Sequence, residues 1–102
     1  MMRTIEMDGA AYASIKAFCE DLKSEIRALP GHGASIEAFV DSMIWANGMS
    51  ELAPPYMIRV RGLHGGPLAE FVKDLSNALG QARMEVRNRR AEDVEVILTL
   101  RR

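Results

Sequence analysis

The sequence predicts an α/β domain in which helices pack on a three-stranded parallel sheet. Three short apolar runs, at residues 3–7, 56–60 and 94–100, are separated by longer segments with helical periodicity. Strands joined by helical segments of this length typically lie parallel, because a parallel pair needs a long crossover connection. With 102 residues, the chain is expected to form a single domain over residues 1–102, with one core and three to four helices.

The three strands are predicted from short apolar runs and from the residues that flank them. The first is expected at Arg3–Met7, where polar and apolar residues alternate before the turn residues Asp8-Gly9. The second, Tyr56–Val60, follows two prolines that deliver the chain in an extended conformation. The third, Val94–Leu100, is the strongest of the three and precedes a short basic tail.

The first helix is predicted to run from a cap at Ser14 to Leu29, where Pro30 ends it. Its apolar residues recur at helical spacing and form one stripe. The members of this stripe are Ile15, Phe18, Cys19, Leu22 and Ile26. Because Cys19 belongs to the stripe, we expect it to be a buried structural thiol.

The last helix is predicted to start at Pro67, because proline is favoured at a first helical position. Its expected apolar residues are Leu68, Phe71, Val72, Leu75, Leu79 and Met84. Gly80 should weaken the C-terminal half of this helix, and residues 87–93 are expected to form a charged loop. The glycine-rich loop at residues 62–66 is a weak candidate for an anion site, and His64 is expected to be an exposed loop histidine.

The stretch Leu29–Trp45 is the best candidate for a contact surface. A Pro-Gly-His-Gly loop precedes a second helix that Ser35 can cap and that Asn47-Gly48 can end. Glu37 and Asp41 are four residues apart, so they share one flank of this helix. Beside them lies an apolar stripe made of Ile36, Phe39, Val40 and Met43. Ile44 and Trp45 are expected to continue the outer flank that carries the two acids. The plainer alternative is a pair of solvated carboxylates, one of them near the positive end of the helix dipole.

The composition and the motifs argue against several classes of function. No apolar run approaches the roughly 20 residues of a membrane span, and the N-terminal residues lack a secretion pattern. The single cysteine cannot form an internal disulfide, so we expect a cytoplasmic protein without a membrane partner. Two histidines, 32 positions apart, give no metal-ligand spacing, and no nucleotide or nucleophile motif is present. We therefore expect no enzyme, no metal and no cofactor.

The basic run Arg87–Arg90 raises the alternative of nucleic-acid binding. The net charge is −1, however, and the isoelectric point of about 6.1 lacks the strong basic bias of nucleic-acid binders. No aromatic residue interrupts the run to stack on bases. Nucleic acid is therefore disfavoured as a partner, and the weak alternative would use the arginines of this region: Arg83, Arg87, Arg89 and Arg90.

The chain resembles the barstar family of cytoplasmic inhibitors of barnase-type ribonucleases, best over residues 5–45. The resemblance rests on the strand and turn Ile5–Gly9, on the first helix with its Leu-Pro ending, and on residues 33–41. The last of these, Gly-Ala-Ser-Ile-Glu-Ala-Phe-Val-Asp, is similar to the family pattern Gly-Glu-Asn-Leu-Asp-Ala-Leu-Trp-Asp. The resemblance resumes at Pro55–Val60, and beyond Gly62 only the order of elements agrees.

The resemblance implies a barstar-like fold and a ribonuclease inhibitor that pairs with a secreted or toxin-type ribonuclease, as in a toxin–antitoxin system. Asp41 matches the central phosphate-mimicking aspartate of the family, Glu37 the second acid and Gly33 the loop glycine, while His32 stands where the family has a tyrosine. The expected partner-binding residues are His32, Gly33, Ser35, Ile36, Glu37, Val40, Asp41, Ile44 and Trp45. We expect a monomer, and the alternative is the same fold with another protein partner.

Overall fold

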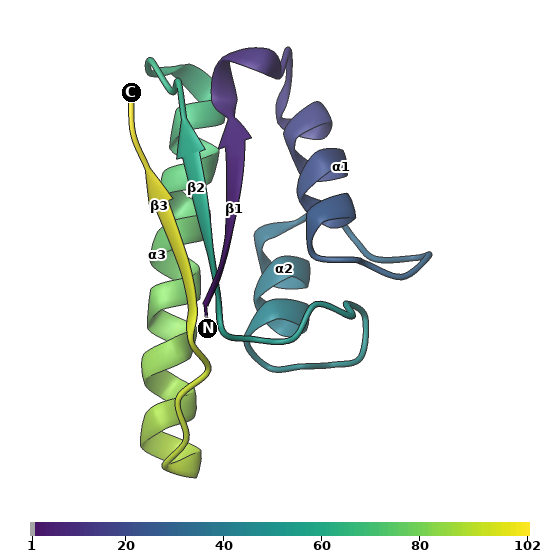
Figure 1. Ribbon diagram of the computed structural model, residues 1–102, viewed down its shortest axis with the longest axis vertical. Coiled ribbons are helices and arrows are strands. Elements are labelled where there is room, and N and C mark those ends of the chain that lie inside the picture. Colours follow the sequence, from purple (N-terminus) through teal and green to yellow (C-terminus); the bar gives the residue numbers. More distant parts are fainter. Residues whose placement is uncertain (1) are drawn as a thin grey trace.

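The computed structural model describes residues 2–102 as a three-stranded sheet with helices on one face (Figure 1). The elements, in chain order, are β1 (Arg3–Asp8), α1 (Ile15–Glu25), α2 (Ile36–Met43), β2 (Tyr56–Arg61), α3 (Gly66–Arg90) and β3 (Val96–Leu100). A short 3₁₀ helix at Gly9–Ala11 links β1 to the segment before α1. The predicted fold class, an α/β domain with a three-stranded parallel sheet, is confirmed.

The sheet has β2 at its centre, with β1 and β3 parallel to it on either side. The register places Ile5, Ile58 and Leu98 in one row, and all three side chains are buried beneath the helices. Because side chains alternate along a strand, the neighbouring rows point to the face that no helix covers. β1 and β2 each extend one residue beyond the predicted end, and β3 begins at Val96 rather than Val94.

Helix α1 begins as predicted, because the Ser14 hydroxyl accepts a hydrogen bond from the Ala17 amide at 3.1 Å. The predicted end at Leu29 is wrong, since the helix ends at Glu25. Arg27 takes a left-handed conformation with φ of 57°, and the following backbone bonds to residues 49–52 instead of continuing the helix. Cys19 is buried as predicted, and this burial raises the pKa of its thiol.

Helix α3 extends further than predicted. The prediction of a charged loop that begins at residue 87 is wrong, since the arginines up to Arg90 are helical. The helix continues to Arg90 and ends where Ala91 adopts a left-handed conformation with φ of 52°. Val86 and Ala82 are buried and carry the apolar stripe through this part, whereas the predicted Met84 is 62% exposed. Basic side chains in the last turn also interact favourably with the negative end of the helix dipole. Among residues 2–102, none of the helices combines the length and the apolar character that crossing a bilayer requires.

Candidate functional site

Helix α2 presents the predicted acid pair on a short, well-anchored element. The Ser35 hydroxyl accepts from the Ala38 amide at 3.1 Å, so the predicted cap is confirmed. The predicted end at Asn47-Gly48 is wrong, because the helix ends at Met43. Ala46 then takes a left-handed conformation with φ of 53°, which the helix cannot continue through.

Glu37 and Asp41 are both exposed on the outer flank of α2. Neither side chain forms an ion pair or a hydrogen bond with any other group in residues 2–102. Glu37 lies in the first turn, where the helix dipole stabilises a negative charge. The two carboxylates therefore remain available for a positively charged partner.

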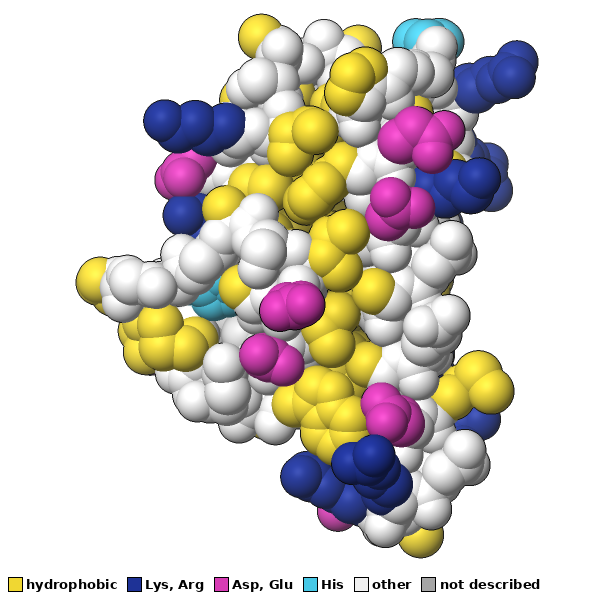
Figure 2. Space-filling model, turned by 180° about the vertical axis from the view of Figure 1, so that it is seen from behind, with side chains coloured by type: hydrophobic (Ala, Val, Ile, Leu, Met, Phe, Trp, Pro, Cys, Tyr) yellow, Lys and Arg dark blue, Asp and Glu magenta, His cyan; other side chains and the backbone are white. Residues whose placement is uncertain are grey.

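A groove runs between α2 and α3, and both acids lie along it. Its volume is about 660 Å³, and we call it the α2–α3 groove. Figure 2 shows a band of hydrophobic side chains along this face, with acidic side chains on both sides of it. The groove is lined by Ile36, Glu37, Val40, Asp41, Trp45, Ala78, Gln81, Ala82 and Glu85.

Four of these lining residues, those from α3, are absent from the predicted site. Ala78, Gln81, Ala82 and Glu85 recur at i, i+3, i+4 and i+7, which places them on one helix face. This spacing is visible in the sequence, but only the packing of α2 against α3 shows that the face meets the acid pair. The α2 side of the groove thus belongs to the predicted site, and the α3 side was not predicted.

Trp45 closes one end of the groove, where two arginines of α3 cover its ring. The guanidinium carbons of Arg89 and Arg90 lie 5.9 and 5.4 Å from the ring centroid. A cation at this distance from an indole face is attracted by the ring quadrupole. The half-buried Trp45 is therefore held in place, and the groove has a basic end as well as an acidic flank.

The other arginines of this region pair with carboxylates inside the chain. Arg83 forms two hydrogen bonds of 2.8 Å with Asp93, and Arg87 lies 3.3 Å from the same carboxylate. These guanidinium groups lower the pKa of Asp93 to about 2. Arg89 pairs with Glu85 at 3.1 Å. The basic run is therefore largely occupied by internal partners.

Two residues predicted to contact a partner are buried instead. Ile44, expected on the outer flank, is only 2% exposed, because α2 ends before it and the chain turns it into the core. His32, expected at the exposed edge of the loop, is 7% exposed and packs on Phe39, with 5.2 Å between ring centroids. Both predictions of surface contact are wrong.

His32 instead fastens the loop to α2. Its Nδ1 donates to the carbonyl oxygen of Gly33 at 2.5 Å, since a carbonyl only accepts. Its Nε2 lies 2.7 Å from the Ser42 hydroxyl oxygen, in hydrogen-bond contact, and that hydroxyl also lies 3.3 Å from the Phe39 carbonyl oxygen. These bonds hold the loop against the helix, so Gly33 and Asp41 line one small hollow beside the groove.

The structure thus brings together most of the predicted site. Five residues from α2 and its C-terminal end share the groove: Ile36, Glu37, Val40, Asp41 and Trp45. Gly33 lies beside them, and the Ser35 side chain is engaged in capping the helix. Asp41 lines both the groove and the smaller hollow, so it occupies the centre of the surface.

No protein-family model and no curated protein matches the chain in sequence comparisons. Within residues 2–102, no three side chains of histidine, cysteine, aspartate or glutamate are grouped so as to hold a metal ion. The site offers two exposed carboxylates that pair with no other side chain of residues 2–102, beside an apolar groove.

Proposed function

We propose that this protein inhibits a barnase-type ribonuclease by covering the basic active site of the enzyme with the α2–α3 groove. The observation that carries the proposal is the pair Glu37 and Asp41, which are exposed, unpaired within the described residues 2–102, and four residues apart on a capped helix. The resemblance of residues 5–45 to the barstar family supports the same assignment. On this proposal the protein acts in the cytoplasm as a monomer and protects its cell from a secreted or toxin-type ribonuclease.

The chemistry of the pair suits such an active site. A ribonuclease holds a polyanion with arginine, lysine and histidine side chains, and a carboxylate can accept charge-assisted hydrogen bonds from them. Asp41, at the centre of the surface, would take the place of a substrate phosphate, with Glu37 supporting it one turn earlier. The apolar side chains of Ile36 and Val40 would exclude water around these bonds and strengthen them.

Nucleic-acid binding by the α3 arginines is less well supported. Arg83 and Arg87 share Asp93, and Arg89 pairs with Glu85. A nucleic-acid phosphate would have to compete with these internal carboxylates. The intramolecular pairs therefore argue against the basic run as a primary binding surface.

A second candidate is the same groove with a different basic protein as its partner. The observation that favours it is the α3 half of the groove, since Gln81, Ala82 and Glu85 lie outside the region that resembles the barstar family. A partner that contacts this half could differ from a barnase-type enzyme. The acid pair would bind such a partner by the same charge-assisted hydrogen bonds.

The proposal is tested by titrating a barnase-type ribonuclease with the protein in a calorimeter. Asp41→Ala is expected to weaken binding by about 100-fold and Glu37→Ala by about tenfold, since each leaves a buried cation of the enzyme without its partner. The matched control is Glu20→Ala, which removes an exposed carboxylate from α1 and should change affinity less than about twofold. Equal binding by Asp41→Ala and the wild type, or no binding by the wild type, would contradict the proposal.

A further inference from the structure

The face of the sheet that no helix covers carries its own set of charged side chains. The register places Glu6, Arg59 and Thr99 in one row across the three strands. The next row begins with Asp8 and Arg61, and Arg101 completes it, because its amide donates to the Val60 carbonyl at 2.9 Å and continues the ladder beyond β3. This face points away from the helices and hence from the α2–α3 groove (Figure 1).

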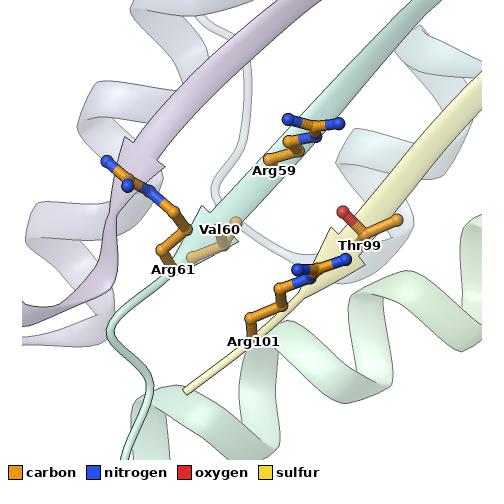
Figure 3. A pocket seen from close by; sticks show the side chains of 5 residues that line it. All are labelled: Arg59, Val60, Arg61, Thr99 and Arg101. Carbon is orange, nitrogen blue, oxygen red and sulfur yellow. The ribbon is translucent and has the colours of Figure 1, made fainter.

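A shallow hollow of about 340 Å³ lies over the β2–β3 half of this face. Its lining comprises Arg59, Val60, Arg61, Thr99 and Arg101, and includes no carboxylate. Figure 3 shows the Arg101 guanidinium extending beside Thr99, while the Arg61 side chain turns toward β1. Three arginines and one hydroxyl therefore line a single hollow, with the Arg61 guanidinium on its β1 side.

The positive charges in this hollow are only partly compensated. Glu6, on β1, lies 3.3 Å from the Arg59 guanidinium and 3.7 Å from that of Arg61. No carboxylate within residues 2–102 pairs with Arg101. Arg101, one residue beyond β3, continues the row that contains Arg61, and its guanidinium extends beside Thr99 rather than toward Glu6. An anion held in the hollow would place a negative charge beside Arg101 and add to the partial compensation that Glu6 gives Arg59 and Arg61.

We propose that the hollow binds the phosphate group of a small phosphate monoester. The planar guanidinium fork matches the oxygen geometry of phosphate and can bond to it through two N–H groups. Three such forks, with the Thr99 hydroxyl, offer more donors than the two oxygens of a carboxylate can accept, whereas a phosphate monoester offers three terminal oxygens. Charge and donor number therefore both favour phosphate.

A single phosphate fits this face better than a nucleic-acid strand does. Sheets that bind single strands stack bases on exposed aromatic side chains. Here the residues that precede the hollow on the same face of β2 and β3 are Met57 and Ile97, which are half-buried and not aromatic. These side chains provide a small apolar shelf beside the hollow but no surface for base stacking.

The test is a titration of the ¹⁵N-labelled protein with inorganic phosphate, followed by amide chemical shifts, against sodium chloride of the same ionic strength. Phosphate should shift the amides of residues 59–61 and 99–101 along a saturable curve, and chloride should not. Arg101→Gln should weaken phosphate binding by about tenfold, the size expected for one charge-assisted hydrogen-bond pair. Arg101→Lys keeps the charge but loses the planar guanidinium fork, so its affinity for phosphate should lie between those of the wild type and Arg101→Gln. The control Lys16→Gln removes a charge from α1 and should change the affinity less than about twofold.

Two further arms identify the source of the phosphate group. Adenosine 5′-monophosphate should bind at least as tightly as inorganic phosphate and shift the same amides. Equal shifts with phosphate and chloride, or an unchanged affinity in Arg101→Gln, would overturn the proposal. So would a single-stranded RNA oligonucleotide that binds far more tightly than the mononucleotide, because that would mark the face as a nucleic-acid surface.

Discussion

The α2–α3 groove differs from the face of the sheet that no helix covers, here called the open face, in the sign of its charged groups and in the elements that carry them. The groove has two carboxylates on one helix beside an apolar band, and neither carboxylate pairs with a side chain in the part of the chain that the structure describes. The open face has guanidinium groups on neighbouring strands, and Glu6 compensates two of the three. A site within one helix can thus be predicted from residue spacing, whereas a site across strands depends on the register of the sheet.

The two faces also differ in what anchors them. The loop beside the groove is tied to α2 by His32, through a buried hydrogen bond with the Ser42 hydroxyl. The open face depends on the backbone ladder of the sheet, and its charged side chains are solvated. Substitutions should therefore affect stability beneath the groove far more than they do on the open face.

The largest stability effect is expected from His32→Ala. The substitution removes two hydrogen bonds at a buried site and the contact with the Phe39 ring, so the free energy of unfolding should fall by about 2–3 kcal/mol. Urea unfolding measures the change. His64→Ala removes an exposed loop histidine and should stay within about 0.5 kcal/mol of the wild type. Equal losses in the two variants would show that His32 does not anchor the groove.

A smaller effect is expected when the cations over Trp45 are removed. Replacing Arg89 and Arg90 by alanine together should lower the free energy of unfolding by about 1–2 kcal/mol, since each of the two exposed cation–π contacts contributes about 0.5–1 kcal/mol. Trp45 is the single tryptophan of the chain, so its fluorescence emission should shift to longer wavelength as the ring meets water. The control Arg102→Ala should leave the emission unchanged. An unaltered spectrum in the double variant would mean that the two arginines do not cover the ring.

On α3, Arg83 and Arg87 share the carboxylate of Asp93, whereas on the open face Arg59 and Arg61 share that of Glu6. The pKa of Asp93 is lowered to about 2 by hydrogen bonds from Arg83 and Arg87, below the ordinary value of 3.8. A lowered folded-state pKa stabilises the fold above the unfolded pKa, and the contribution is lost as the pH falls from about 4 to about 2. Asp93→Asn should lack this part of the acid sensitivity in unfolding curves recorded at each pH. An identical acid profile for Asp93→Asn and the wild type would contradict the pairing.

The smallest effect on stability is expected at Glu6. Glu6→Gln breaks two exposed ion pairs and should change the free energy of unfolding by less than about 1 kcal/mol. It should also tighten phosphate binding on the open face by about threefold, because it removes the carboxylate that competes for Arg59 and Arg61. Asp74→Asn, on α3, serves as the control. Weaker phosphate binding by Glu6→Gln would show that Glu6 organises the arginines rather than competing with the ligand.

Much of the fold could be predicted from local patterns. The caps at Ser14 and Ser35, the three strands and the acid pair each depend on residues close together in the chain. The ends of α1 and α2 could not be predicted, because Arg27 and Ala46 adopt left-handed conformations that their residue types do not favour. Contacts with distant segments determine these ends, as when residues 26–29 bond to residues 49–52.

The missed parts of both sites have the same cause. The burial of His32 depends on Phe39 and Ser42, and the α3 half of the groove depends on how two helices meet. The arginine hollow requires the register that sets Arg59 beside Thr99 and Arg61 beside Arg101. None of these neighbours is indicated by spacing along the chain, so they become visible only in the folded structure.

The most direct test of the proposed function is the RNA-cleaving rate of a barnase-type ribonuclease mixed with an equimolar amount of the protein. The wild type should suppress cleavage. A groove variant, Glu37→Gln with Asp41→Asn, should leave cleavage nearly intact, while an open-face variant, Arg59→Gln with Arg61→Gln, should inhibit as the wild type does. Equal inhibition by the wild type and the groove variant, or inhibition lost only in the open-face variant, would contradict the assignment of the α2–α3 groove as the inhibitory surface.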